Sequence, residues 1–163
     1  MTAPARPTLS LLALVGFIGL CLLAGGLGGW VTAANVKTWY PTLIRPPGTP
    51  PDWLFGPVWT TLYILMGIAA WRIWRQGGAA RRAALGLWFA QLAANAIWTP
   101  VFFGAHRLGL ALVIVVALLG LIGGTIAAFR RRDGLAAGLL VPYAIWTCYA
   151  TYLNAGFAWL NPG

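Results

Sequence analysis

Three apolar stretches of this 163-residue chain carry aromatic and polar side chains at a spacing that puts them on one face of a helix. The three sets are Trp59 and Tyr63, then Gln91, Asn95 and Trp98, and finally Trp146, Ala150 and Asn154. Polar groups are costly inside an apolar segment, so they often mark a functional site. Flat aromatic walls with a few hydrogen-bonding groups suit a large, planar, hydrophobic ligand. Helix packing can explain each face alone, and their combination favours a ligand cavity.

The sequence contains few residues that could perform acid–base or metal chemistry. The only acids are Asp52 and Asp133, and the only histidine, His106, lies beside Arg107 in a short loop. These residues form no carboxylate pair, nucleophile–base pair or metal-ligand cluster. An interfacial position suits His106 better than the alternative role of an axial haem ligand. The sequence therefore predicts no hydrolytic or metal catalysis and no required cofactor.

Five hydrophobic stretches must position the three faces. They cover about 9–31, 57–74, 85–103, 108–129 and 135–160. A bilayer core about 30 Å thick needs about 20 helical residues, and lipid offers the backbone no hydrogen-bond partner. The composition, 60% hydrophobic and 8% charged, agrees with such a protein. We therefore expect an all-α membrane protein, a five transmembrane helix bundle that forms a single domain over residues 1–163.

The distribution of charge predicts how these helices are oriented. A net charge of +9 would suggest nucleic acid as the partner of a soluble protein, but here the basic residues lie between the hydrophobic stretches. The loops on the side of the N-terminus, with Arg6, hold eight basic residues, and the opposite loops hold three. The positive-inside rule then places the N-terminus in the cytoplasm and the C-terminus outside. A short N-terminus without transit-peptide character favours a bacterial cell membrane, and no nucleic-acid partner is predicted.

Small residues recur at four-residue spacing in three of the stretches, where they let helices approach closely. The sets are Gly25 and Gly29, then Gly86, Ala90 and Ala94, and finally Gly120 and Gly124. Packing within one chain explains most of them. The third stretch has the longest set, so it is the candidate interface of a homodimer. In the first stretch, the glycines and its length favour a retained helix over a cleaved signal peptide. Cys21 and Cys148 both lie inside predicted spans, which excludes a disulfide framework.

The first loop, residues 32–55, combines five prolines with several aromatic residues. The aromatic residues include Trp39, Tyr40 and Trp53. Because proline restricts the backbone, the loop should be stiff. An aromatic belt at the membrane interface and a lid over a pocket on the non-cytoplasmic side fit this composition equally well. Further along, Pro100 and Pro142 predict kinks in two of the helices.

Several motifs occur in an order that identifies a family. They are Trp39-Tyr40, PPDWLFGPVW at 50–59, QLAANAIWTPVFF at 91–103, VPYAIW at 141–146 and ATYLN at 150–154. Together they resemble the tryptophan-rich sensory protein/translocator protein (TspO, peripheral benzodiazepine receptor) family. The resemblance implies a five-helix fold, usually homodimeric, that binds protoporphyrin IX-type tetrapyrroles and synthetic aromatic drugs beneath the first loop.

The resemblance also implies roles for single residues. It assigns Trp39 and Trp53 to a lid and the following four to the cavity walls: Trp59, Asn95, Trp146 and Ala150. It likewise places a dimer interface of bacterial relatives on the small residues of the third helix. Gly48 stands where relatives often carry a tryptophan, so one lid contact should be absent. No basic residue follows Tyr152, so specific cholesterol binding is not predicted.

Three functions compete at this point. The leading one is a tetrapyrrole-binding receptor or transporter in the membrane, with membrane lipid around it. The second is light-dependent porphyrin degradation, with Trp59 and Trp146 as redox-active residues. The third is a regulatory module that senses a ligand without transporting it. Transport and sensing need the same pocket, so the sequence leaves that choice open.

Overall fold

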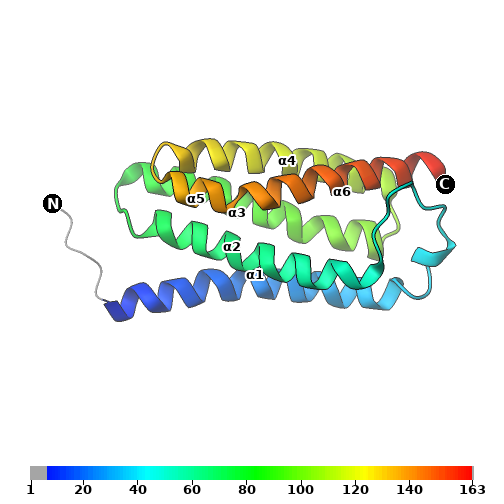
Figure 1. The fold of residues 1–163 in the computed structure, drawn as a ribbon, viewed down its shortest axis with the longest axis horizontal. Helices are drawn as coiled ribbons and strands as arrows, with labels where there is room; N and C mark the ends of the chain where they lie inside the picture. Colours follow the sequence, from blue (N-terminus) through cyan, green and yellow to red (C-terminus); the bar gives the residue numbers. More distant parts are fainter. Residues whose placement is uncertain (1–6, 163) are drawn as a thin grey trace.

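The computed structural model describes residues 7–162, which form a bundle of long helices lying side by side (Figure 1). The helices are α1 (Pro7–Asn35), α2 (Phe55–Trp74), α3 (Ala79–Thr99), α4 (Leu108–Arg130), α5 (Gly134–Leu139) and α6 (Val141–Leu160). Two short 3₁₀ turns, η1 (Tyr40–Thr42) and η2 (Asp52–Leu54), lie in the first loop, and a π-helical turn, η3 (Pro100–Gly104), continues α3. Since α5 and α6 follow one another almost directly, the helices form five rods, and the described residues contain no strand.

Four helical segments of the described chain are long and apolar enough to cross a membrane. They are Thr8–Asn35, Asp52–Trp74, Leu108–Arg130 and Gly134–Leu160. Helix α3 is the exception, because it includes two arginines in its first turn and two polar residues further along. The predicted all-helical membrane fold agrees with these segments, and the helix count fits five rods.

The helix boundaries differ from the predicted ones where charged residues continue a helix. Helix α3 begins at Ala79, six residues before the predicted start, and includes Arg81 and Arg82. Arginine has good helix propensity, and its long stem lets the charged group reach water. Kinks were predicted at two prolines, and both lie where a regular α-helix is interrupted: η3 begins at Pro100, and Pro142 lies in the first turn of α6, just after α5 ends.

Large apolar side chains from the rods other than α1 fill the interior, and α1 contributes the buried Cys21. Met66 of α2, Trp88 of α3 and Leu118 of α4 are fully buried in the main core. The Trp88 Nε1–H donates a hydrogen bond of 3.2 Å to the Met66 carbonyl, so the polar edge of this indole has a partner. A second cluster joins Tyr40 of the first loop to Phe157 of α6. This second cluster ties the loop to one end of the bundle.

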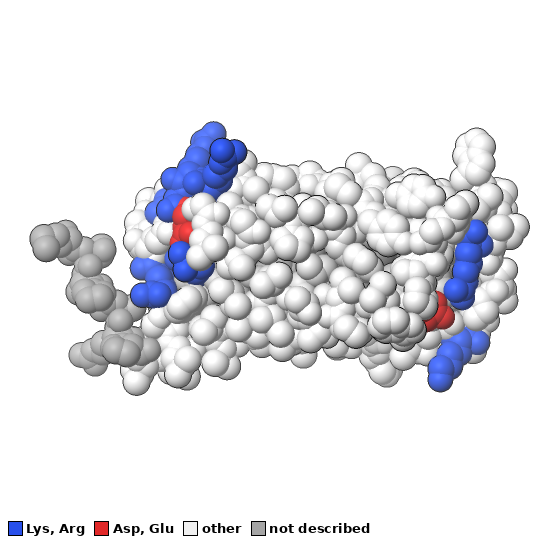
Figure 2. Space-filling model, in the orientation of Figure 1, with Lys and Arg blue, Asp and Glu red and all other residues white. Residues whose placement is uncertain are grey.

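Charged side chains gather at the two ends of the bundle, and the middle of the face in view is uncharged (Figure 2). Seven arginines lie at the end where α2 meets α3 and α4 meets α5, and three basic residues lie at the other end; Arg6 lies outside the described residues. At the first end Arg72 Nη2 is 2.9 Å from Asp133 Oδ2. Although burial raises it, the Ala136 N–H hydrogen bond and the Arg72 guanidinium hold the pKa of the Asp133 carboxyl below its ordinary value. This carboxylate caps α5 and joins it to α2.

Candidate functional site

A cavity of about 510 Å³ lies at the end of the bundle that carries the first loop. Its walls come from α1, α2, α6, the α3–η3 junction and the first loop. Its aromatic lining residues are Tyr40, Phe55, Trp59, Tyr63, Trp98, Phe102, Phe103 and Phe157. The first loop therefore closes one end of a hollow whose walls are mostly aromatic or apolar.

Half of the ten residues predicted to bind a ligand line this cavity. They are Trp59, Tyr63, Trp98, Ala150 and Asn154. The other five, which lie outside the lining, are Trp39, Trp53, Gln91, Asn95 and Trp146. Each of the three predicted faces thus contributes to one hollow: the α2 face with both its residues, the α3 face with Trp98, and the last face with Ala150 and Asn154.

Hydrogen bonds hold the polar lining residues in place. The Trp98 Nε1–H donates to Asn154 Oδ1 at 3.0 Å, and Asn154 Nδ2 donates to the Leu108 carbonyl at 2.9 Å. These bonds satisfy both groups of the Asn154 amide within the protein. The Trp98 ring is also next to Trp59, with centroids 6.4 Å apart, and Trp59 in turn stacks on Tyr63 at 5.5 Å. Trp98, Trp59 and Tyr63 therefore form one continuous, preformed aromatic part of the lining.

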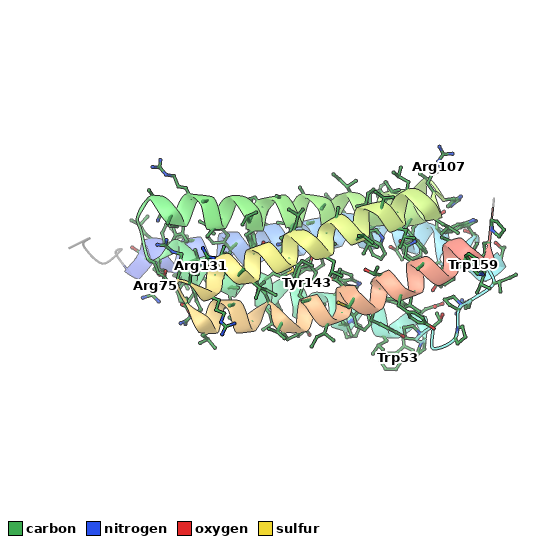
Figure 3. All side chains as sticks on the ribbon, turned by 90° about the horizontal axis from the view of Figure 1, so that it is seen from above. Trp53, Arg75, Arg107, Arg131, Tyr143 and Trp159 are labelled. Atoms are coloured by element: carbon green, nitrogen blue, oxygen red, sulfur yellow. The ribbon has the colours of Figure 1, made fainter. Side chains whose placement is uncertain are left out.

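Asn95 supports this wall from behind. Its side chain is 1% exposed, and its Oδ1 accepts a 2.7 Å hydrogen bond from the Tyr63 hydroxyl. Its Nδ2 donates to the Tyr143 hydroxyl at 3.1 Å, deep between the helices (Figure 3). Gln91 lies one turn further from the cavity, and its amide atoms have no hydrogen-bond partner among the described residues. The α3 face thus contributes Trp98 to the lining and Asn95 to its support.

The predicted lid tryptophans lie around the cavity. Trp53 is 71% exposed at the loop end of the molecule (Figure 3). Trp39 stacks on His106, with ring centroids 4.0 Å apart, and presents its ring edge-on to Phe102, which lines the cavity. Trp146 approaches the lining residue Phe55 at 6.1 Å between centroids. Trp39 and Trp146 thus contact the wall from outside.

Helix α6 fixes the first loop by several polar contacts. Asn161 Oδ1 accepts a hydrogen bond of 2.9 Å from the Ile44 N–H, and its Nδ2 donates to the Ile44 carbonyl at 3.1 Å. Tyr149 donates its hydroxyl proton to the Gly48 carbonyl. Gly48 has a φ of 80°, a conformation that favours glycine. A hydrogen bond to the backbone therefore holds the loop at Gly48.

The cavity wall contributed by α1 was not predicted from the sequence. It consists of Leu22, Gly25, Gly26, Gly28, Gly29, Thr32 and Ala33, and Val36 extends it just beyond the end of the helix. The prediction that these glycines serve helix packing is right for Gly25, where a Cβ atom would overlap the Tyr63 ring, whereas Gly29 has no neighbouring atom within 4 Å of such a Cβ. The run of glycines was visible in the sequence, but the aromatic residues that face it come from other helices, so the sequence alone did not indicate a cavity wall.

The cavity opens to the outside of the bundle between α1 and α2. Exposed residues from both helices line it: Leu22, Gly26, Gly29 and Ala33 on α1, and Gly56 and Thr60 on α2. The α1 residues follow one another at helical spacing along one stripe. This stripe lies within a segment long and apolar enough to span a membrane.

The small residues predicted to form a dimer interface lie on the outside of α3. Gly86 and Ala90 are exposed and Ala94 is half-buried. A Cβ atom at Gly86 would meet no atom within 4 Å. This face is thus free in the single chain.

Comparisons with known proteins agree with the motifs and the fold. The model of the TspO/MBR family matches residues 17–160. The chain is 41% identical over 143 residues to a translocator protein of Bos taurus, covering 86% of this chain and 85% of that protein. It is 40% identical over 145 residues to protein CrtK of Rhodobacter capsulatus (88% and 89%) and 40% identical over 154 residues to tryptophan-rich protein TspO of Chlorobaculum tepidum (93% and 98%).

Proposed function

We propose, from the premise that this chain belongs to the TspO/MBR family, that it binds a tetrapyrrole such as protoporphyrin IX in the cavity, as a receptor or transporter in the membrane. The observation that carries this proposal is the aromatic cavity of about 510 Å³. This volume is within the range of about 300–1,000 Å³ usual for ligand pockets. The stacked rings of Trp59 and Tyr63, with the Trp98 ring next to them, suit a flat apolar body.

The opening between α1 and α2 supports the same ligand class. A large apolar macrocycle partitions into the bilayer, and this opening lies at the level of the membrane-spanning segments. Relatives bear the names translocator protein and tryptophan-rich sensory protein. Translocation and sensing both require an occupied cavity, so binding is the step to test first.

Filling the cavity tests the proposal. Replacing Ala150 with tryptophan adds an indole to a lining position, so protoporphyrin IX should bind at least about tenfold more weakly, a change of about 1.4 kcal/mol. Quenching of the protein's tryptophan fluorescence during titration with protoporphyrin IX measures the affinity. The matched control is Ile145→Trp, on the same helix at a side chain that is 66% exposed.

The control should bind like the parent. Equal affinities for the parent, Ala150→Trp and Ile145→Trp would mean that porphyrin contacts the outer surface and would refute this site.

The orientation proposed for the membrane follows the charges. We propose that all five rods cross a bacterial cell membrane, with the seven-arginine end in the cytoplasm. The N-terminus is then cytoplasmic and the C-terminus is outside. Reporter fusions to the two termini should report opposite sides, and the same side for both would contradict five crossings.

We also propose a homodimer through the outer face of α3. Replacing Ala90 with tryptophan should convert the dimer to a monomer, because a large side chain prevents two small-residue faces from meeting. Light scattering of the detergent-solubilised protein measures the mass, and Ile145→Trp should keep the dimer. A dimer in both variants would place the interface elsewhere.

A further inference from the structure

One ion pair lies at the rim of the cavity. Arg45 Nη1 is 3.5 Å from Asp52 Oδ1, and both side chains are partly exposed, at 38% and 43%. Asp52 is the only charged residue among those that line the cavity. The Arg45 guanidinium also lies over the ring of Tyr40, another lining residue, at 4.8 Å from its centroid. Arg45 therefore lies next to two lining residues without lining the cavity itself.

The backbone on both sides of Arg45 is fixed. Ile44 is held by both hydrogen bonds to the Asn161 amide. Pro46 packs so tightly on Gly156 of α6 that a Cβ atom there would lie 2.6 Å from the proline ring. The backbone of Arg45 is thus held in a defined position at the rim, while its partly exposed guanidinium can still move. Positioning of this kind lowers the entropic cost of binding.

The bond to Asp52 is weak enough to be exchanged. A strong charge-assisted hydrogen bond has an N–O distance of about 2.7–2.9 Å, shorter than the 3.5 Å observed here. Exposed ion pairs contribute only about 0–1 kcal/mol to the stability of a protein. A carboxylate that reaches the rim from inside the cavity could accept two hydrogen bonds from the same guanidinium. It would also face Arg45 from a drier environment than Asp52 does.

We propose that the Arg45 guanidinium binds a carboxylate of the ligand, and that it pairs with the Asp52 carboxylate instead when the cavity is empty. The inference rests on the proposed function and narrows its ligand class to planar macrocycles that carry a carboxylate at one edge. The apolar body lies among the aromatic walls, and the acid group lies at the rim beside the first loop.

The experiment compares protoporphyrin IX with its dimethyl ester, which has the same ring but no free acid. The Arg45→Gln variant should bind the free acid about tenfold more weakly, and the ester within about twofold of the parent. Asp52→Asn removes the competing carboxylate, so it should bind the free acid more tightly. Arg45→Lys keeps the charge and should recover part of the loss. Tryptophan quenching in detergent measures all affinities.

Arg107→Gln is the matched control. Arg107 is an exposed cation at the same end of the molecule, and its side chain points away from the bundle (Figure 3). The affinity of the Arg107→Gln variant for the free acid should equal that of the parent. Equal losses for acid and ester in Arg45→Gln, or no loss for either, would overturn the inference while porphyrin binding by the parent persists. A parent that binds neither ligand would instead refute the proposed function itself.

Discussion

Replacing Asn95 with leucine is expected to lower the free energy of unfolding by about 2–4 kcal/mol and to weaken porphyrin binding. The substitution leaves the Tyr63 hydroxyl without its acceptor and the Tyr143 hydroxyl without its donor, both in the interior. A buried polar group without a partner costs about 1–3 kcal/mol, and a side-chain hydrogen bond between membrane helices contributes about 0.6–2 kcal/mol. Tyr63 also stacks on Trp59, so its release disturbs the cavity wall. The thermal midpoint in detergent and a protoporphyrin titration measure the two effects.

Gln91→Leu is the matched control for this prediction. It makes the same kind of change one helical turn away, at a side chain that is also 1% exposed. Because the Gln91 amide has no hydrogen-bond partner among the described residues, its removal should leave stability unchanged or raise it. If the two variants lose stability equally, burial of leucine in this region is the cause, and the tyrosine–asparagine bonds contribute little.

The arrangement of helices could be predicted largely from hydropathy, because lipid permits few alternatives to a helix. The sequence could not indicate where α3 begins. The charge of Arg81 and Arg82 favoured a loop at these positions. In the structure, however, Arg81 donates a 2.8 Å hydrogen bond to the Trp74 carbonyl at the end of α2, so it connects the two helices. This contact depends on tertiary structure, and residue spacing does not encode it.

The candidate site could be predicted in part. Spacing of three or four residues identifies a helical face, and so Trp98 and Asn154 were found. Depth and rotation within the bundle decide whether a residue lines the cavity or supports it, which separates Trp98 from Asn95. The four-residue spacing of the glycines in α1 indicated helix packing, and a residue without a side chain does not show whether it faces a helix or a cavity, so Gly29 was missed as part of a wall. The aromatic residues it faces come from other helices.

Replacing Gly67 of α2 with alanine is expected to destabilise the protein by about 3 kcal/mol, the upper end of the usual cost of overpacking. A Cβ atom at this position would lie 2.7 Å from Cα and 2.8 Å from the backbone nitrogen of Ile18 on α1. Backbone atoms inside a helix cannot move away as a flexible side chain can, so α1 and α2 would have to separate. The thermal midpoint in detergent measures this loss.

The same separation should weaken ligand binding, because these two helices form both sides of the cavity opening. Gly29→Ala is the control, since a Cβ atom there meets nothing within 4 Å and alanine favours a helix by about 1 kcal/mol over glycine. Its stability should therefore equal or exceed that of the parent, opposite in sign to Gly67→Ala. If both glycines tolerate alanine equally, close contact between α1 and α2 at Ile18 does not hold the wall of the cavity in place.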